Sequence, residues 1–245
     1  MRRGFCAVFL REVLILKRRI FRQMLSWSVM PLLYLIAFGY AMGRHVQVGD
    51  HSYLEFLIPG LVAMSSMTQS YAIAGEINIA RFYWHIFEEF QVAPISNFSY
   101  VLGEVLAGIT RALLAVGVIV VLGLLFGVVL SYSVYFFLAL LLNSFVFASL
   151  AVAVAMLVKS HADQALLNNF VITPMAFLGG TFFPLEHLPA WAQQILYFVP
   201  LTHAAEAIRA ASFGQPPKLV NFIVLGGIGI MFFIVAILCV NHARD

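Results

Sequence analysis

The sequence predicts an all-α membrane protein, a single transmembrane domain over residues 1–245 with six transmembrane helices. Of its residues, 62% are hydrophobic and only 10% are charged, whereas soluble domains are roughly 45–50% apolar and about 25% charged. Six apolar stretches approach the ~20 residues that a helix needs to cross a bilayer. Seven of the 14 Lys and Arg residues precede the first stretch. The net charge of +3 is too small to indicate nucleic-acid binding.

The six predicted spans lie at 25–43, 53–75, 98–126, 134–158, 165–184 and 218–240. Basic residues before the first span place the N-terminus in the cytoplasm, because Lys and Arg are retained on that side. An even number of spans then returns the C-terminus to the cytoplasm. The two cysteines, Cys6 and Cys239, lie at opposite chain ends on this reducing side, so no structural disulfide is expected.

Residues 4–22 predict an amphipathic helix at the membrane interface. Its apolar side chains recur at spacings of three and four residues, at Phe5, Phe9, Val13, Leu16 and Ile20. The alternative is that the cations of this segment only fix the topology.

A second amphipathic helix is predicted at 76–93, between spans two and three. Arg81, His85, Glu88 and Glu89 share one face, and Pro94 ends the helix. This segment is longer than an ordinary connection of about 4–6 residues. It suits docking to a partner, and the alternative is a helix that merely joins two spans.

Residues 185–213 are too polar to span a membrane and rich in proline and aromatic side chains. They predict a re-entrant pair of short helices at the outer face, with Trp191 in the interfacial aromatic belt. The residues singled out around this segment are Pro184, Glu186, Pro189, Trp191, Pro200 and Arg209.

The chain lacks the residue patterns of several enzyme classes. It has no Gly-x-x-x-x-Gly-Lys-Ser/Thr loop, no His-Glu-x-x-His, no Cys-x-x-Cys and no Gly-x-Ser-x-Gly. We therefore predict no catalytic residue and no metal site, and ATP would have to be handled by another chain.

Glu104 and Arg111 share a face of the third span. Glu104 is expected at the cytoplasmic interface, and Arg111 either lines a pathway or forms a structural pair.

Four stretches of the sequence resemble the ABC-2 type permeases, the transmembrane subunits of ATP-binding-cassette exporters. They are 53–60, 87–94, 177–186 and 188–191, the last leading to 200–202 and Arg209. Their order and spacing are most similar to the compact bacterial permeases related to nodulation-factor and surface-polysaccharide exporters.

This resemblance implies a bacterial inner-membrane protein that pairs with a second permease copy, as a homodimer or a heterodimer. It also implies a separate ATPase subunit, which would bind ATP and Mg²⁺ and contact Arg81, His85, Glu88 and Glu89; no cofactor is expected on this chain. The substrate would be amphipathic, such as a lipid-linked saccharide, a lipid or a drug. Ser66, Ser70, Tyr71 and Arg111 are the predicted pathway residues. The alternatives are a channel or scaffold without ATP coupling, and a secondary carrier.

Overall fold

The computed structural model describes residues 4–42, 47–84, 86–158 and 160–243. Their architecture is helical, apart from an antiparallel hairpin of strands β1 (Gln47–Val48) and β2 (His51–Ser52). Within the described ranges, four helices are long and apolar enough to cross a membrane: α1 (Gly4–Met42), α5 (Asn97–Leu125), α6 (Val134–Leu157) and α11 (Leu219–His242). The last three coincide with predicted spans to within a few residues.

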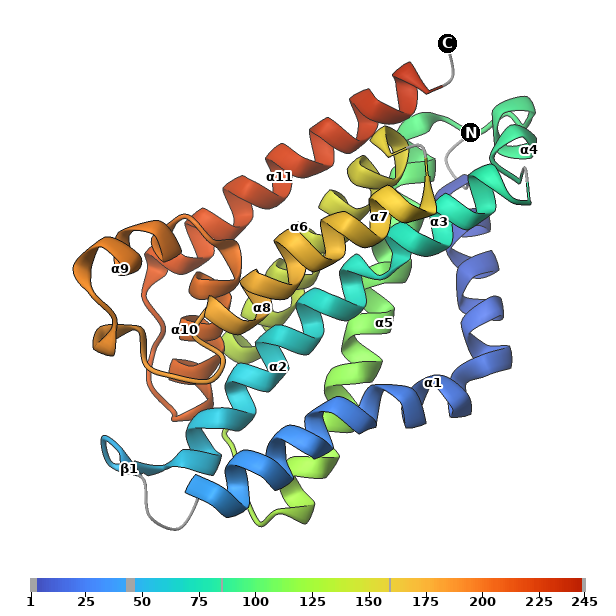
Figure 1. The fold of residues 1–245 in the computed structure, drawn as a ribbon. Coiled ribbons are helices and arrows are strands. Elements are labelled where there is room, and N and C mark those ends of the chain that lie inside the picture. Colours follow the sequence, from blue (N-terminus) through green and yellow to red (C-terminus); the bar gives the residue numbers. More distant parts are fainter. Residues whose placement is uncertain (1–3, 43–46, 85, 159, 244–245) are drawn as a thin grey trace.

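The N-terminal segment differs from the prediction, because one continuous helix, α1, replaces the separate helices expected at 4–22 and 25–43. No glycine or proline interrupts residues 5–30, and Pro31 is accommodated inside the helix. The predicted break near residues 22–25 is therefore wrong. Figure 1 shows that the first part of α1 crosses the end of the bundle before the helix turns along it.

The centre of the bundle is α2 (Tyr53–Tyr71), which packs against α5, α6 and α10 (Pro200–Ser212). It begins at a capping box: the Ser52 hydroxyl accepts from the Glu55 N–H, and the Glu55 carboxylate accepts from the Ser52 N–H. Because it is enclosed by protein, α2 carries serines and other polar side chains. It is accordingly not among the four helices apolar enough to cross a membrane.

The predicted helix at 76–93 is also divided. The chain passes from α2 through Ala72 into α3 (Ile73–Phe82), and a separate helix, α4 (Ile86–Val92), follows. The prediction of a single helix over 76–93 was therefore wrong. Its first half continues the second predicted span, and only its second half stands apart.

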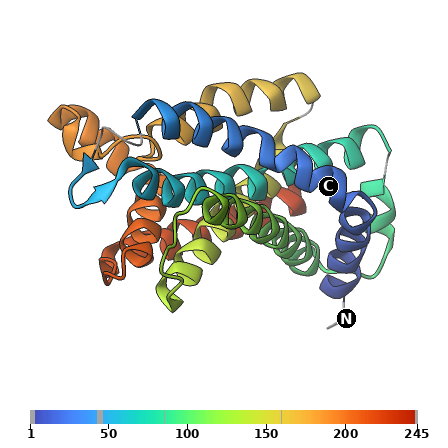
Figure 2. The same ribbon diagram turned by 90° about the horizontal axis from the view of Figure 1, so that it is seen from below.

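The fifth predicted span, 165–184, corresponds to a helical segment that starts earlier and ends earlier. It consists of α7 (His161–Leu167), a π-helical stretch η1 (Asn168–Ile172) and α8 (Thr173–Leu178). The helix stops at Gly179 and Gly180, the latter with φ +83°, a backbone conformation that favours glycine. Figure 2 shows α1 and α7–α8 on the same side of α2.

After this stop the chain forms a 3-10 turn, η2 (Leu185–His187), then α9 (Ala190–Tyr197) and α10. Short helices thus occupy the 185–213 segment, and its re-entrant position in a membrane stays a prediction. Pro184 and Pro189 immediately precede helices and Pro200 opens α10, positions where the missing N–H costs little.

The bundle has two distinct ends (Figure 1). At the end that carries α4, Gly4 packs against Ile95 and Ser99, and the side chains of Asn97 and Asn241 are hydrogen-bonded. At the opposite end, which carries β1 and β2, the His51 ring stacks on Phe213 with centroids 3.8 Å apart. We call these the α4 end and the hairpin end.

Candidate functional site

The α3–α4 segment is anchored to the end of α6. Arg81 Nη1 donates to the carbonyl oxygen of Met156 (2.7 Å), and Asn78 Nδ2 donates to that of Val158 (3.3 Å). The last carbonyls of a helix lack partners within it and carry partial negative charge, so a cation there is favourable. Burial lowers the pKa of the Arg81 guanidinium below its usual value. Arg81 therefore caps α6, and its predicted contact with an ATPase stays a prediction.

Aromatic side chains attach α4 to α5. The Tyr100 ring lies 5.6 Å from Phe87 and 5.4 Å from Phe90, centroid to centroid. The other side of this segment is exposed: Tyr83 is 79% and Val92 88% accessible to solvent.

Of the acidic residues predicted on α4, Glu89 is exposed. Glu88 lies in α4, but its side chain is outside the described part of the structure, as is the whole of His85. The structure thus presents part of the predicted contact set on an exposed surface.

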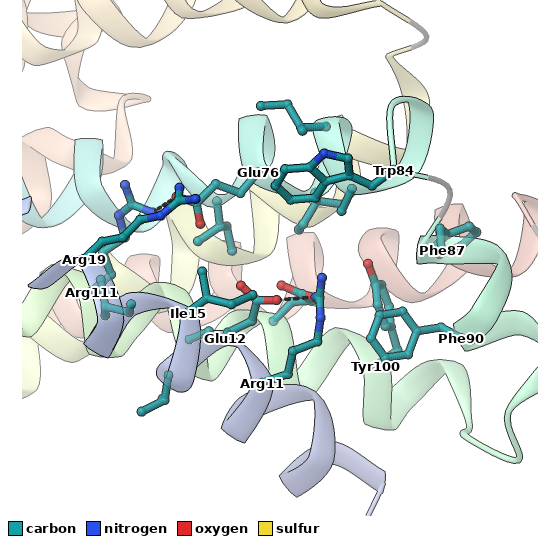
Figure 3. Close-up of a pocket in the computed structure, with 18 of the residues that line it drawn as sticks. Arg11, Glu12, Ile15, Arg19, Glu76, Trp84, Phe87, Phe90, Tyr100 and Arg111 are labelled. Atoms are coloured by element: carbon teal, nitrogen blue, oxygen red, sulfur yellow. Dashed lines mark hydrogen bonds and ion pairs between the residues drawn. The ribbon is translucent and has the colours of Figure 1, made fainter.

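Between the first part of α1, the α3–α4 segment and α5 lies a cavity of about 230 Å³, which we call the charged cavity. Figure 3 shows side chains from all three elements directed into it. Its charged lining residues are Arg11, Arg19, Arg111, Glu12, Glu76 and Glu104, and its aromatic ones are Trp84, Phe87, Phe90 and Tyr100.

Two ion pairs lie in the walls of this cavity, and one of them joins two helices. Arg11 Nη1 lies 2.5 Å from Glu12 Oε1 within α1. Arg111 of α5 pairs with Glu76 of α3, and its guanidinium lies 5.8 Å from the Trp27 ring. Of the two roles left open for Arg111, this pair supports the structural one. Glu104 is 2% exposed and so is buried within the protein. Its expected position at the cytoplasmic interface stays a prediction.

The hairpin end contains a different arrangement around Arg209, which we call the Arg209 clamp. Arg209 Nη2 donates to the Gly180 carbonyl (2.7 Å), and its guanidinium lies 3.8 Å from the centroid of the Phe56 ring. Burial lowers the pKa of Arg209 to about 10, so the side chain remains charged near neutral pH.

The loop that follows α8, which contains Gly180, is also fixed to the start of α2. Tyr53 Oη donates to the Phe182 carbonyl (2.8 Å). A Cβ atom added at Gly60 would lie 2.3 Å from the Thr181 carbonyl oxygen, so only glycine permits this approach. The Arg209 clamp thus joins three of the stretches on which the family resemblance rests: 53–60, 177–186 and the segment leading to Arg209.

The remaining residues singled out before α10 lie near the surface. Trp191 is 66% exposed and Glu186 is exposed, while Pro184 is half-buried. Gln193 Nε2 donates to the Leu188 carbonyl (2.8 Å), which closes the turn between η2 and α9. A position of Trp191 in an interfacial belt is consistent with this exposure.

The predicted pathway residues of α2 are buried within the subunit. Ser66 accepts a hydrogen bond from Asn143 Nδ2 of α6 (2.7 Å), and Ser70 donates to the Ser66 carbonyl (2.6 Å). Tyr71 accepts from Gln164 Nε2 of α7 (3.2 Å). The contacts of Ser66 and Tyr71 join α2 to α6 and α7, whereas that of Ser70 lies within α2. A role in a substrate pathway stays a prediction.

Sequence reasoning did not find the charged cavity or the Arg209 clamp as sites. Arg11 and Glu12 of α1 are far in the chain from Glu76 of α3, and only the packing of these helices brings them together. The usable signal was the presence of Glu104 and Arg111 in an apolar helix, since ionised groups there require partners. Among the described residues, no group of three or more His, Cys, Asp or Glu could hold a metal ion.

Residues 3–213 match the family described as "ABC-2 type transporter". The chain belongs to this family. Membership makes it a non-catalytic membrane permease subunit and implies a partnering ATPase subunit. The resemblance inferred from the four sequence stretches is thereby confirmed.

Named relatives cover most of the chain. Nodulation protein J of Neorhizobium galegae is 33% identical over 223 residues, which cover 87% of this chain and 82% of that protein. The inner membrane transport permease YadH of Escherichia coli K12 is 31% identical over 220 residues, covering 86% and 84%. Nodulation protein J of Rhizobium meliloti is 34% identical over 223 residues, covering 87% and 82%.

Proposed function

We propose that this chain is the permease subunit of an exporter in the bacterial inner membrane, with six crossings and the α4 end in the cytoplasm. The supporting observation is that the basic first part of α1, the α4 segment and the end of α11 gather at one end of the bundle (Figure 1). Retention of Lys and Arg on the cytoplasmic side then orients the whole molecule. The inner-membrane location also follows the name of the YadH relative.

The α3–α4 segment is the coupling element of this proposal, and the observation that carries it is its combination of anchorage and exposure. Arg81 fixes α3 to α6, and Tyr100 fixes α4 to α5. Glu89 and Val92 remain exposed on the outer side. A separate ATPase that binds there could displace α4 and thereby pull on both helices. In this proposal ATP and Mg²⁺ bind to that partner, and this chain holds no cofactor.

A second permease copy is proposed to cover the side of α2 that carries α1 and α7–α8 (Figure 2). Both elements carry exposed large apolar side chains, among them Leu33 (53%) of α1 and Phe170 (76%) of the π-helical stretch η1. The adjacent Asn168 and Asn169 are also exposed. Amide side chains at membrane depth normally face protein or water rather than lipid, which supports a partner or a pathway at this face. Either a homodimer or a heterodimer would cover this face.

The proposed substrate is amphipathic, of the class of a lipid-linked saccharide, a lipid or a hydrophobic drug. The apolar and amide side chains on the α1 and α7–α8 face suit such a molecule. A secondary carrier would instead transport without ATP, driven by a proton gradient, and a scaffold or channel would not stimulate hydrolysis.

The test is ATP hydrolysis by the cognate ATPase reconstituted with the full-length permease. Glu89→Lys combined with Val92→Asp should lower permease-stimulated hydrolysis at least tenfold, because both side chains lie on the proposed contact surface. The matched control is Glu186→Lys, an exposed charge reversal near the hairpin end, which should leave hydrolysis unchanged. Unaltered stimulation and co-purification in the double variant would contradict the coupling role.

A further inference from the structure

The first part of α1 has an exposed apolar row that differs from the stripe expected from its sequence. The expected stripe is half-buried, and two of its members, Val13 and Leu16, line the charged cavity. Four other large side chains are 55–76% accessible to solvent: Leu10, Leu14, Phe21 and Leu25. Their spacings of four, seven and four residues place them within about 60° of one another around a helix axis. The side of α1 that the protein leaves uncovered is therefore apolar along its middle.

Three cations flank this row. Lys17, Arg18 and Arg22 are exposed. On an ideal helix Lys17 falls on one side of the row, and Arg18 and Arg22 fall on the other. No described residue forms an ion pair or a hydrogen bond with any of these three side chains. We call the four apolar and three basic residues together the outward face of α1.

This face has no carboxylate of its own. The one acidic residue of 4–42 is Glu12, which is paired with Arg11 and lines the charged cavity. Glu12 lies on the opposite side of the helix from the apolar row. The outward face therefore carries a formal charge of +3 from its three cations, and its counter-charge must come from another molecule.

The combination of apolar and basic side chains fits a membrane surface better than an acidic protein. At an interface the apolar side chains enter the acyl region, while the long stems of Lys and Arg carry their charges out to the phosphates. The first part of α1 crosses the end of the bundle (Figure 1), as a helix in the interface plane would. It continues into the rest of α1, which is long and apolar enough to cross a membrane.

The charge of the face selects the class of lipid. An anionic head group brings only negative charge to the three cations, and basic segments beside a membrane are attracted to such lipids. A zwitterionic head group would bring an ammonium as well, and the outward face offers no carboxylate to receive it. Anionic phospholipids therefore match this face better than zwitterionic ones.

We propose that the outward face of α1 docks on anionic phospholipids, with their phosphates at Lys17, Arg18 and Arg22 and their acyl chains against Phe21 and Leu25. The leaflet rests on the proposed function, because it is the cytoplasmic one if the α4 end is cytoplasmic. The class of lipid does not depend on that orientation or on the ATPase.

The test measures lipid retention by the purified full-length chain with native mass spectrometry, in micelles that contain equal amounts of phosphatidylglycerol and phosphatidylethanolamine. The wild-type chain should retain phosphatidylglycerol at least tenfold in preference. The triple variant Lys17→Gln, Arg18→Gln and Arg22→Gln should retain the two lipids about equally. Glycerophosphoglycerol, the same head group without acyl chains, should bind at least tenfold more weakly than the lipid.

Two neighbouring arginines provide a matched pair of single variants. Arg18→Gln should lower the preference at least threefold. Arg19→Gln removes the same charge from an exposed position beside the charged cavity (Figure 3) and should leave the preference unchanged. Glutamine is a good helix former, so both variants should keep α1 folded. Equal retention of the two lipids by the wild type, or equal effects of the two single variants, would overturn the proposal.

A spin label reports contact with the bilayer directly. In a chain carrying Cys6→Ser and Cys239→Ser, the label is attached at Leu14→Cys or at Arg19→Cys, and the chain is placed in phosphatidylglycerol vesicles. Dissolved oxygen should relax the label at Leu14→Cys more than a water-soluble nickel chelate does, and the order should reverse at Arg19→Cys. The nickel chelate relaxing Leu14→Cys more strongly would overturn the proposal. Loss of ATPase binding by the triple variant with an unchanged lipid preference would assign the face to that partner instead.

Discussion

The two ends of the bundle use buried charge in opposite ways. At the hairpin end, Arg209 is held by a backbone carbonyl and an aromatic ring, and Gly60 brings α2 into direct contact with the Thr181 backbone. At the α4 end, six charged side chains from three elements surround a cavity of about 230 Å³. The Arg209 clamp is closed by contacts to the main chain, whereas the walls of the charged cavity meet through contacts between side chains.

This difference indicates which end can move. A carbonyl and a glycine contact admit little change of geometry, because close-packed atoms leave no room. Ion pairs between side chains at an open cavity tolerate a shift of one helix relative to another. We therefore expect the hairpin end to act as a fixed joint, and the α4 end to carry the motion of a coupled subunit.

The largest effect is expected from breaking the Arg209 clamp. Arg209→Met keeps much of the side-chain volume but removes a charge-assisted hydrogen bond and a desolvated cation–π contact. Its expected cost is about 3 kcal/mol in the free energy of unfolding. Equilibrium unfolding of the purified chain in mixed detergent measures it. Arg22→Met, at an exposed position of α1, is the control, and equal stability of the two variants would remove the clamp from the account.

Gly60→Ala tests the close approach in the same clamp. The new methyl group would overlap the Thr181 carbonyl oxygen, 2.3 Å away, and overpacking of this kind typically costs about 1–3 kcal/mol. Gly75→Ala in α3 is the matched control, because nothing lies within 4 Å of its Cβ position. That change should stabilise the helix by up to ~1 kcal/mol. The midpoint temperature of thermal unfolding should fall in Gly60→Ala and rise in Gly75→Ala. A shift of both midpoints in the same direction would contradict the close packing at Gly60.

Sequence reasoning predicted the family and the apolar spans better than it predicted where one helix ends and the next begins. Helices α5, α6 and α11 follow from continuous apolar runs, since bilayer thickness sets their length. The continuity of α1 does not follow from its pattern, because the amphipathic spacing of 4–22 and the apolar run of 25–43 predict two elements with different surroundings, whereas no glycine or proline separates them. The break between α3 and α4 was missed because no proline or glycine marks residues 83–85.

The candidate sites were less predictable than the fold. Arg209, Tyr53 and Gly60 stood within stretches singled out for their likeness to a family, but nothing local to them reveals that they meet. The charged cavity depends on Glu12, Glu76 and Glu104 converging from separate helices, which no spacing along the chain encodes.

The smallest of the stability effects concerns the ion pair between Glu76 and Arg111. The Glu76 side chain is 46% exposed, so solvent screens the pair and its coupling free energy should be about 0.5 kcal/mol. A double-mutant cycle with Glu76→Gln and Arg111→Met isolates this value from the effects of the single changes. A coupling above about 2 kcal/mol would show that the α4 end is as firmly joined as the hairpin end.

Cross-linking to the ATPase tests the central claim, that the α4 end is the coupling end, most directly. In a chain carrying Cys6→Ser and Cys239→Ser, a single cysteine is introduced by Tyr83→Cys at the α4 end or by Trp191→Cys before α10. Both positions are well exposed, at 79% and 66%. With a short bifunctional thiol–amine reagent in membranes that also contain the cognate ATPase, Tyr83→Cys should give the permease–ATPase product and Trp191→Cys should give none. A product from Trp191→Cys, or no product from Tyr83→Cys, would contradict the account.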